Sequence, residues 1–128
     1  MTNGVTYDTG ALIAADHNDR RMWALHAGFL AEEVSPTVPT PVLAEAWRGG
    51  SRQASLARFL ALCSLESMSE QQAKSVGVLA GKADRDAIVD VTVVEGAIRR
   101  HDAIVTSNHI HIRKISQAVR AKITIEQI

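Results

Sequence analysis

The sequence predicts an α/β fold, with a mostly parallel central sheet of about four or five strands flanked by helices on both faces. Short β-prone runs alternate with longer segments whose apolar residues recur at three- and four-residue spacing. Aromatic residues form only 4% of the chain, which favours a core packed by aliphatic side chains. The 128 residues suit one hydrophobic core and show no internal repeat or linker, so we expect a single domain over 1–128.

The composition excludes several classes of protein. The chain carries 14 basic and 14 acidic residues, so any basic surface must be local. Cys63 is the only cysteine, which excludes an internal disulfide and a multi-cysteine zinc site, and we expect a buried, inert thiol. The start Met-Thr-Asn-Gly lacks the basic and apolar regions of a signal peptide, and no apolar run approaches the length of a membrane span. We therefore expect a cytoplasmic protein with no membrane partner.

The N-terminal half is predicted from periodicity and from turn residues. We expect a strand at Val5–Tyr7 and helices at Ala11–Ala15, Arg20–Glu33 and Arg52–Leu62. The prolines at positions 36, 39 and 41 exclude a helix across them but permit a short extended segment. They also permit a helix that begins at Pro41, with Thr40 as its N-cap.

The C-terminal half continues the alternation of helices and strands. Ser69 and Gln72 have the spacing of a capping box, so they predict the start of a helix. We expect these elements: a short strand within Leu62–Met68, helices at Ser69–Ala80, Asp84–Arg99 and Asn108–Ala118, and strands at Ala103–Val105 and Lys122–Ile125.

Three carboxylates occupy comparable places in this pattern. Asp8 directly follows the first strand, Glu45 falls in the first turns of the third helix, and Asp90 lies on the long helix with Asp86 four residues before it. Ligands bind at the carboxyl ends of strands in open α/β sheets, and clustered carboxylates suit Mg²⁺ or Mn²⁺. The simpler readings stay open, with Asp8 as a helix N-cap and Glu45 as a solvated helix residue.

Other candidate sites are weaker. Arg48 and Arg52 follow Glu45 and suit a phosphate backbone, although arginines on a helix are more often only solubilising. The pair His109-x-His111 has no cysteine or further histidine nearby. This favours two surface histidines at the start of a helix over two metal ligands. No Gly-rich nucleotide loop, P-loop lysine or Gly-x-Ser-x-Gly elbow is present.

Four motifs, taken in order, resemble those of the PIN-domain ribonucleases, and above all the VapC-like toxins of type II toxin–antitoxin pairs. They are strand-Asp8-Thr9-Gly10-Ala-Leu-Ile-Ala, Pro41-Val-Leu-Ala-Glu45, Asp86-Ala-Ile-Val-Asp90 and Ile104-Val-Thr106-Ser-Asn108. The resemblance implies a three-layer PIN-like fold and a Mg²⁺- or Mn²⁺-dependent endoribonuclease that hydrolyses RNA with metal-activated water. It also implies a homodimer and a cognate antitoxin that fills the active-site groove.

The resemblance assigns roles to individual residues. Asp8, Glu45 and Asp90 match the three family acids and are expected to be catalytic and to hold the metal. Thr106 matches the hydroxyl residue that helps orient the site. Asp90 is preferred to Asp86 because it lies sixteen residues before Thr106, the usual family offset.

The remaining assignments include a departure from the family pattern. Asp86 is expected to support the metal-binding acids without touching the metal, or to be an acid at the helix start, and Arg48 and Arg52 would position RNA. Asn108, which is also expected to support the site without touching the metal, stands where the family often has a fourth acid. His111 stands where an aspartate often follows. An asparagine adds no negative charge, which weakens the expectation of a second metal ion.

Two alternatives remain open. The first is a non-catalytic PIN-like binding module that acts through protein or RNA partners. The second is a phosphatase-like or DNA-directed metallohydrolase on a similar fold, since fold does not fix substrate.

Overall fold

The computed structural model describes residues 4–128 and contains a five-stranded sheet in which every pairing is parallel. Its strands are β1 (Gly4–Tyr7), β2 (Thr37–Pro39), β3 (Ser64–Glu66), β4 (Asp102–Thr106) and β5 (Ile125–Gln127). They lie in the order β3-β2-β1-β4-β5, which places β1 at the centre. The first three residues, to which the signal-peptide expectation refers, lie outside the described range.

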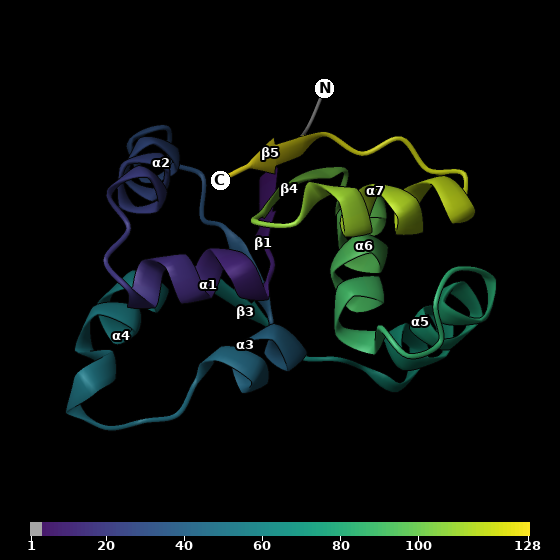
Figure 1. The fold of residues 1–128 in the computed structure, drawn as a ribbon, viewed down its shortest axis with the longest axis horizontal. Helices are drawn as coiled ribbons and strands as arrows, with labels where there is room; N and C mark the ends of the chain where they lie inside the picture. Colours follow the sequence, from purple (N-terminus) through teal and green to yellow (C-terminus); the bar gives the residue numbers. More distant parts are fainter. Residues whose placement is uncertain (1–3) are drawn as a thin grey trace.

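The helices form two layers, one on each side of the sheet (Figure 1). They are α1 (Thr9–Asp16), α2 (Arg20–Ala31), α3 (Thr40–Ala46), α4 (Ala54–Leu60), α5 (Glu70–Lys82), α6 (Ile88–Arg100) and α7 (His109–Ala118), with a 3-10 helix η1 (Ser51–Gln53) before α4. Helices α1, α2 and α4 pack together on one side, and α5, α6 and α7 on the other. Helix α3 touches both α1 and α6. The three-layer α/β expectation is confirmed.

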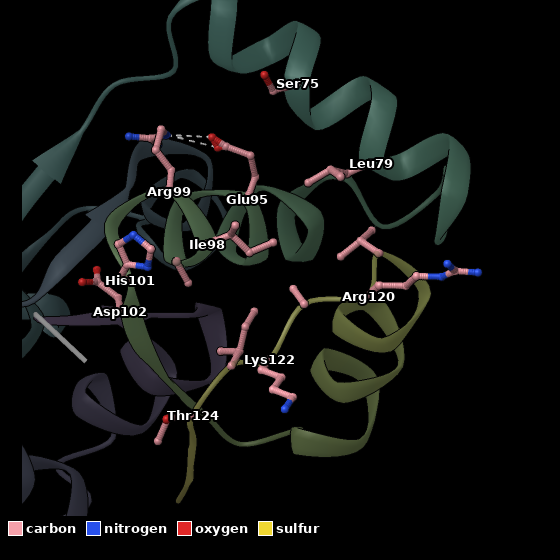
Figure 2. Close-up of a pocket in the computed structure, with 14 residues that line it drawn as sticks. Ser75, Leu79, Glu95, Ile98, Arg99, His101, Asp102, Arg120, Lys122 and Thr124 are labelled. Carbon is pink, nitrogen blue, oxygen red and sulfur yellow. Dashed lines mark hydrogen bonds and ion pairs between the residues drawn. The ribbon is translucent and has the colours of Figure 1, made fainter. Parts of the chain in front are cut away.

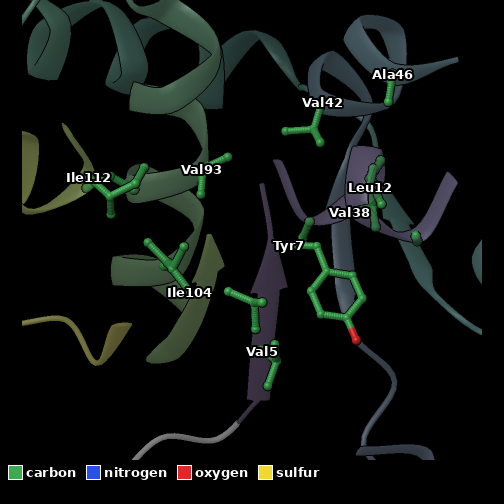
Figure 3. Packing of buried hydrophobic residues seen from close by; sticks show 14 of the residues in the cluster. Val5, Tyr7, Leu12, Val38, Val42, Ala46, Val93, Ile104 and Ile112 are labelled. Atoms are coloured by element: carbon green, nitrogen blue, oxygen red, sulfur yellow. The ribbon is translucent and has the colours of Figure 1, made fainter. Parts of the chain in front are cut away.

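The core fills both interfaces between the sheet and its helices. Tyr7 and Leu12 lie on one side of β1, whereas Val93 and Ile112 lie on the other (Figure 3). Tyr7 is fully buried, and its hydroxyl bonds Nδ1 of His26 at 2.9 Å. Burial lowers the pKa of His26, so this histidine serves the core as a neutral hydrogen-bonding partner.

Helix α6 begins at Ile88, and the prediction that it begins at Asp84 is wrong. The Asp84 carboxylate accepts from the backbone N–H of Asp86 at 3.0 Å, and the Asp84 carbonyl accepts from Ala87 at 3.2 Å. These bonds form a turn that takes the place of the first helical turn. Asp86 is therefore exposed on a turn and does not share a helix face with Asp90.

Smaller differences occur at other element ends. The last strand is Ile125–Gln127 rather than Lys122–Ile125, because the ladder pairs Ile104 with Ile125 and continues to Thr106. Helix α3 already includes Thr40, so its N-cap is Pro39, which offers no side-chain acceptor.

The N-terminus of α5 forms half of the predicted capping box. The Ser69 hydroxyl accepts from the Gln72 backbone at 3.0 Å, as expected. The Gln72 amide instead donates to Glu66 at 3.3 Å, because β3 ends within its reach.

Cys63 is partly rather than fully buried. Burial still raises the pKa of its thiol to about 12, and Sγ donates to the Phe59 carbonyl at 3.5 Å. The thiol is therefore protonated at neutral pH, as the expectation of an inert cysteine requires. No helix within residues 4–128 is long and apolar enough to cross a membrane.

Candidate active site

Asp8 stands at the point where β1 passes into α1. Its backbone N–H donates to the Val105 carbonyl at 3.2 Å, which keeps it against β4. Its Oδ1 accepts from the Ala11 N–H at 3.0 Å, so Asp8 is the N-cap of α1. The residue is only 5% exposed, and burial raises the pKa of its carboxyl. The cap reading is therefore correct in geometry, but a capping bond to Oδ1 leaves the carboxylate with further lone pairs for a ligand.

The end of β4 packs against this cap. The fully buried Thr106 hydroxyl accepts from the Asn108 backbone N–H at 2.9 Å, and its nearness to Asp8 opposes part of the rise in the pKa of that carboxyl. Gly10 faces Ser107 so closely that a Cβ on Gly10 would collide with the serine hydroxyl. The missing side chain of Gly10 therefore allows the first turn of α1 to approach the residue that follows β4.

Glu45 is joined to α1 by one short hydrogen bond. Its Oε1 accepts from the Thr9 hydroxyl at 2.6 Å, on a side chain that is otherwise exposed on α3. Helix α3 contacts both α1, which Asp8 caps, and α6, which carries Asp90, so this bond holds Glu45 on a helix that packs against both. Thr9 was not predicted to matter, since a contact over 36 residues leaves no local pattern.

Asp90 lies in the first turn of α6 and binds a histidine. Its Oδ2 is 2.7 Å from Nδ1 of His111, and Nε2 of His111 is 3.6 Å from Oδ2 of Asp84. Burial raises the pKa of Asp90; His111 opposes the shift, and the charges of Glu45 and Asp84 add to it. His109 and His111 lie in the first turn of α7, as the interpretation of a helix-start surface expects, but the contacts of His111 with Asp90 and Asp84 were not predicted. His109 instead bonds Gln127 at 2.7 Å.

The predicted acids therefore share one electrostatic neighbourhood. The charge of Asp90 raises the pKa of Asp8, and the charge of Glu45 raises that of Asp90. Such mutual repulsion is what a divalent cation would relieve. Asp86 is not part of this group; Asp84 is the acid of that turn that reaches His111.

The donor set fits a hydrated hard cation. Within residues 4–128, no group of three acidic, histidine or cysteine side chains is arranged to enclose a metal ion. One oxygen of each of Asp8, Glu45 and Asp90 contacts a protein group, which leaves the other oxygen of each carboxylate for a water or a cation. Mg²⁺ is usually held by one or two carboxylates and keeps several waters, which these all-oxygen donors allow.

No protein-family model matches the sequence, and no curated protein matches it either. Among solved structures, the chain is similar to one in the crystal structure of VapBC2 from Rickettsia felis bound to a DNA fragment from their promoter. The TM-score is 0.71, the match covers 96% of this chain and 97% of that one, and 18% of residues are identical. This chain has a VapC-like PIN fold. The resemblance carried by the four motifs is confirmed for the fold.

In this PIN fold the two predicted RNA-binding arginines are not equivalent. Arg48 follows the end of α3 and bends back onto it, where Nη1 donates to the carbonyls of Trp47 at 2.7 Å and Ala44 at 3.1 Å. Arg52 is exposed on η1. The loop between them is braced by buried Gln53, whose Oε1 accepts from the Arg48 N–H at 2.6 Å.

A large cavity of the PIN fold lies away from the acids (Figure 2). It has a volume of about 910 Å³ and opens between α5, the C-terminal half of α6 and the segment after α7. Neither Asp8 nor Glu45 nor Asp90 lines it. Glu95, at its wall, is neutralised by Arg99 at 2.9 Å.

Proposed function

We propose that this protein is a Mg²⁺- or Mn²⁺-dependent endoribonuclease that acts as the toxin of a toxin–antitoxin pair. The observation that supports the proposal is that Asp8, at the end of β1, lies near enough to Asp90 for their charges to interact, as Asp90 does to Glu45, in a PIN-like fold. Oxygen donors at the carboxyl end of a parallel sheet suit a hard cation and a phosphate-bearing substrate.

The chain's own residues would divide the work. Asp8, Glu45 and Asp90 would hold the cation, directly or through its waters. The Thr9 hydroxyl holds Glu45 in place by its hydrogen bond, and Thr106 would help to orient Asp8, near which it lies. A bound Mg²⁺ or Mn²⁺ would supply the Lewis acid that activates a water and stabilises charge on the phosphate.

The partners follow from the same proposal. Arg52 and Arg48 would contact the RNA backbone near Glu45, since guanidinium groups pair well with phosphates. The similar solved structure is named as a VapBC2 complex, and we propose an antitoxin partner for this chain by that likeness. We also propose a homodimer that acts in the cytoplasm, as expected from the resemblance and the sequence.

The test is cleavage of a mixed single-stranded RNA by the purified, metal-free protein. Cleavage should appear on adding Mg²⁺ or Mn²⁺ and stop on adding a chelator, and expression of the protein alone should arrest growth. RNA that stays intact with either metal, under conditions where the protein is folded, would contradict the proposal.

A second function is favoured by one observation. Asn108 supplies no charge, and its side-chain oxygen caps α7 by accepting from the His111 N–H at 3.3 Å. A PIN-like binding module would use this surface without catalysis. Binding of RNA with equal affinity in Mg²⁺ and in chelator, without cleavage, would identify that function.

A further inference from the structure

His111 separates two carboxylates on the α6 side of the site. Its Nδ1 is 2.7 Å from Asp90 Oδ2, and its Nε2 is 3.6 Å from Asp84 Oδ2. Both ring nitrogens therefore face carboxylate oxygens, and neither is directed as a ligand toward Asp8 and Glu45. In this arrangement the imidazole is a partner of the two acids rather than a metal ligand.

The imidazole is held firmly in this place. Asn108 accepts from the His111 backbone, and the next residue, Ile112, is only 1% exposed in the core. Two residues earlier, Gln127 of β5 binds both the backbone and the ring of His109, at 2.9 and 2.7 Å. The start of α7 is thus fixed from β5 and from the core, and His111 projects from it with little freedom.

We propose that His111 is a positioning residue that limits the active site to one divalent cation. This inference rests on the proposed metal-dependent function and specifies it further. Asp84 is the other acid that His111 contacts beside Asp90, so a second hard cation at this place would use oxygens of both. The imidazole occupies the space between these two carboxylates, 2.7 Å from Asp90 Oδ2 and 3.6 Å from Asp84 Oδ2. Asp8, Glu45 and the remaining oxygen of Asp90 are left for a single ion with its waters.

The experiment counts ions rather than activity. Metal-free protein is titrated with MnCl₂, and bound Mn²⁺ per chain is measured by calorimetry and by the loss of the free-ion EPR signal. The parent should bind one ion. H111D, which replaces the imidazole by a further carboxylate, should bind two.

A matched control separates local from general charge effects. Q117D adds one acid to an exposed position on the same helix and should still bind one ion. If H111D does not fold, H111A takes its place, because it also frees Asp84 and Asp90, and the expected count is again two.

The outcomes are distinguishable. Two ions on the parent, or one ion on a folded variant that lacks the imidazole, would overturn the role of His111 and leave the metal-dependent function standing. A parent that binds no ion would overturn both proposals.

Discussion

Helix α6 connects two charged regions of opposite character. At its start, Asp90 stands among acids, and the pKa values of Asp90 and Asp8 are raised, chiefly by burial and in part by neighbouring carboxylates. At its end, Arg99 and Arg100 meet Glu66, and hydrogen bonds from Arg99 above all lower the pKa of that glutamate. Ionisation of Asp8 and Asp90 in the first region therefore destabilises the fold, whereas ionisation of Glu66 in the second region stabilises it.

The second region is a network of ion pairs and hydrogen bonds centred on Arg100. The Arg100 guanidinium contacts Glu66 at 2.7 Å, Asp102 at 3.0 Å and the Thr6 hydroxyl at 2.9 Å. Thr6 in turn donates to Asp102 at 2.8 Å. Gly96 makes room for it, because a Cβ there would stand 2.7 Å from an Arg100 nitrogen. Every charged side chain in this network has a partner of opposite charge, so the network stabilises the fold and is not a binding site.

The largest effect should come from Asp8 in the first region. D8N keeps the cap of α1, because asparagine is an equally good cap, but it removes the charge that a hard cation needs. We expect RNA cleavage to fall by about 10²–10³-fold, the scale of losing one electrostatic stabiliser of the transition state. The melting temperature in chelator should not fall.

The matched control is D19N. Asp19 caps α2 in the same manner, accepting from the Met22 N–H at 2.9 Å, but it lies outside the acid group. Its replacement should leave cleavage unchanged. A D8N protein that cleaves as fast as D19N would reduce Asp8 to a structural cap.

The comparison of the two regions also shows what the sequence could predict. Asp8 could be found because a strand and a helix start flank it, and the alternation of elements predicted the sheet. Asp86 was misplaced because helical spacing continues back to Asp84, while the side chain of Asp84 closes a turn that interrupts it. The bond from Thr9 to Glu45 joins distant residues, as does that from His111 to Asp90, and no local spacing encodes either.

The Arg100 network was missed for the same physical reason. Arg99 and Arg100 occur together at a helix end, where basic residues are expected on general grounds. Only the folded sheet brings Glu66, Thr6 and Asp102 around Arg100. A neighbouring pair of arginines therefore predicts a helix end and nothing about its partners.

Breaking the second region should cost stability without affecting chemistry. The Arg100 side chain is 19% exposed, and R100A would leave Asp102 buried with only Thr6 as a partner. We expect the free energy of unfolding to fall by about 3 kcal/mol, which is the lower end of the range for removing one member of a buried ion pair. Urea unfolding measures it, with R113A at an exposed position of α7 as the control. Equal stability of the two variants would show that the network is only a solvated surface.

The pH dependence of stability should have opposite signs in the two regions. A carboxyl whose pKa is raised by folding favours the fold at low pH, and this contribution is lost as pH rises above the ordinary aspartate value of 3.8 toward the raised one. Glu66, whose pKa is lowered, loses its contribution as pH falls below its ordinary value of 4.5.

D90N tests this in chelator. The asparagine has no proton to release, so its melting temperature relative to the parent should rise between about pH 4 and about pH 7, around and above the ordinary carboxyl range. Saturating Mn²⁺ should raise the melting temperature of the parent and stabilise D90N less. A constant difference across this range, with equal stabilisation of both proteins by Mn²⁺, would contradict the repulsion assigned to Asp90.

The smallest effect concerns the two arginines near Glu45. Arg52 is exposed on η1, so R52A should weaken RNA binding and lower the slope of log affinity against log salt by about 0.7, the value for one phosphate contact on a single strand. The Arg48 guanidinium must first leave the carbonyls of Ala44 and Trp47, so R48A should have a smaller effect on both quantities. Filter binding over a range of salt concentrations measures the two variants against the parent. A larger loss of RNA affinity in R48A than in R52A would mean that the Arg48 side chain leaves the end of α3 in the complex and contacts the RNA more strongly than Arg52. Unchanged binding in both variants would place the RNA path on another surface.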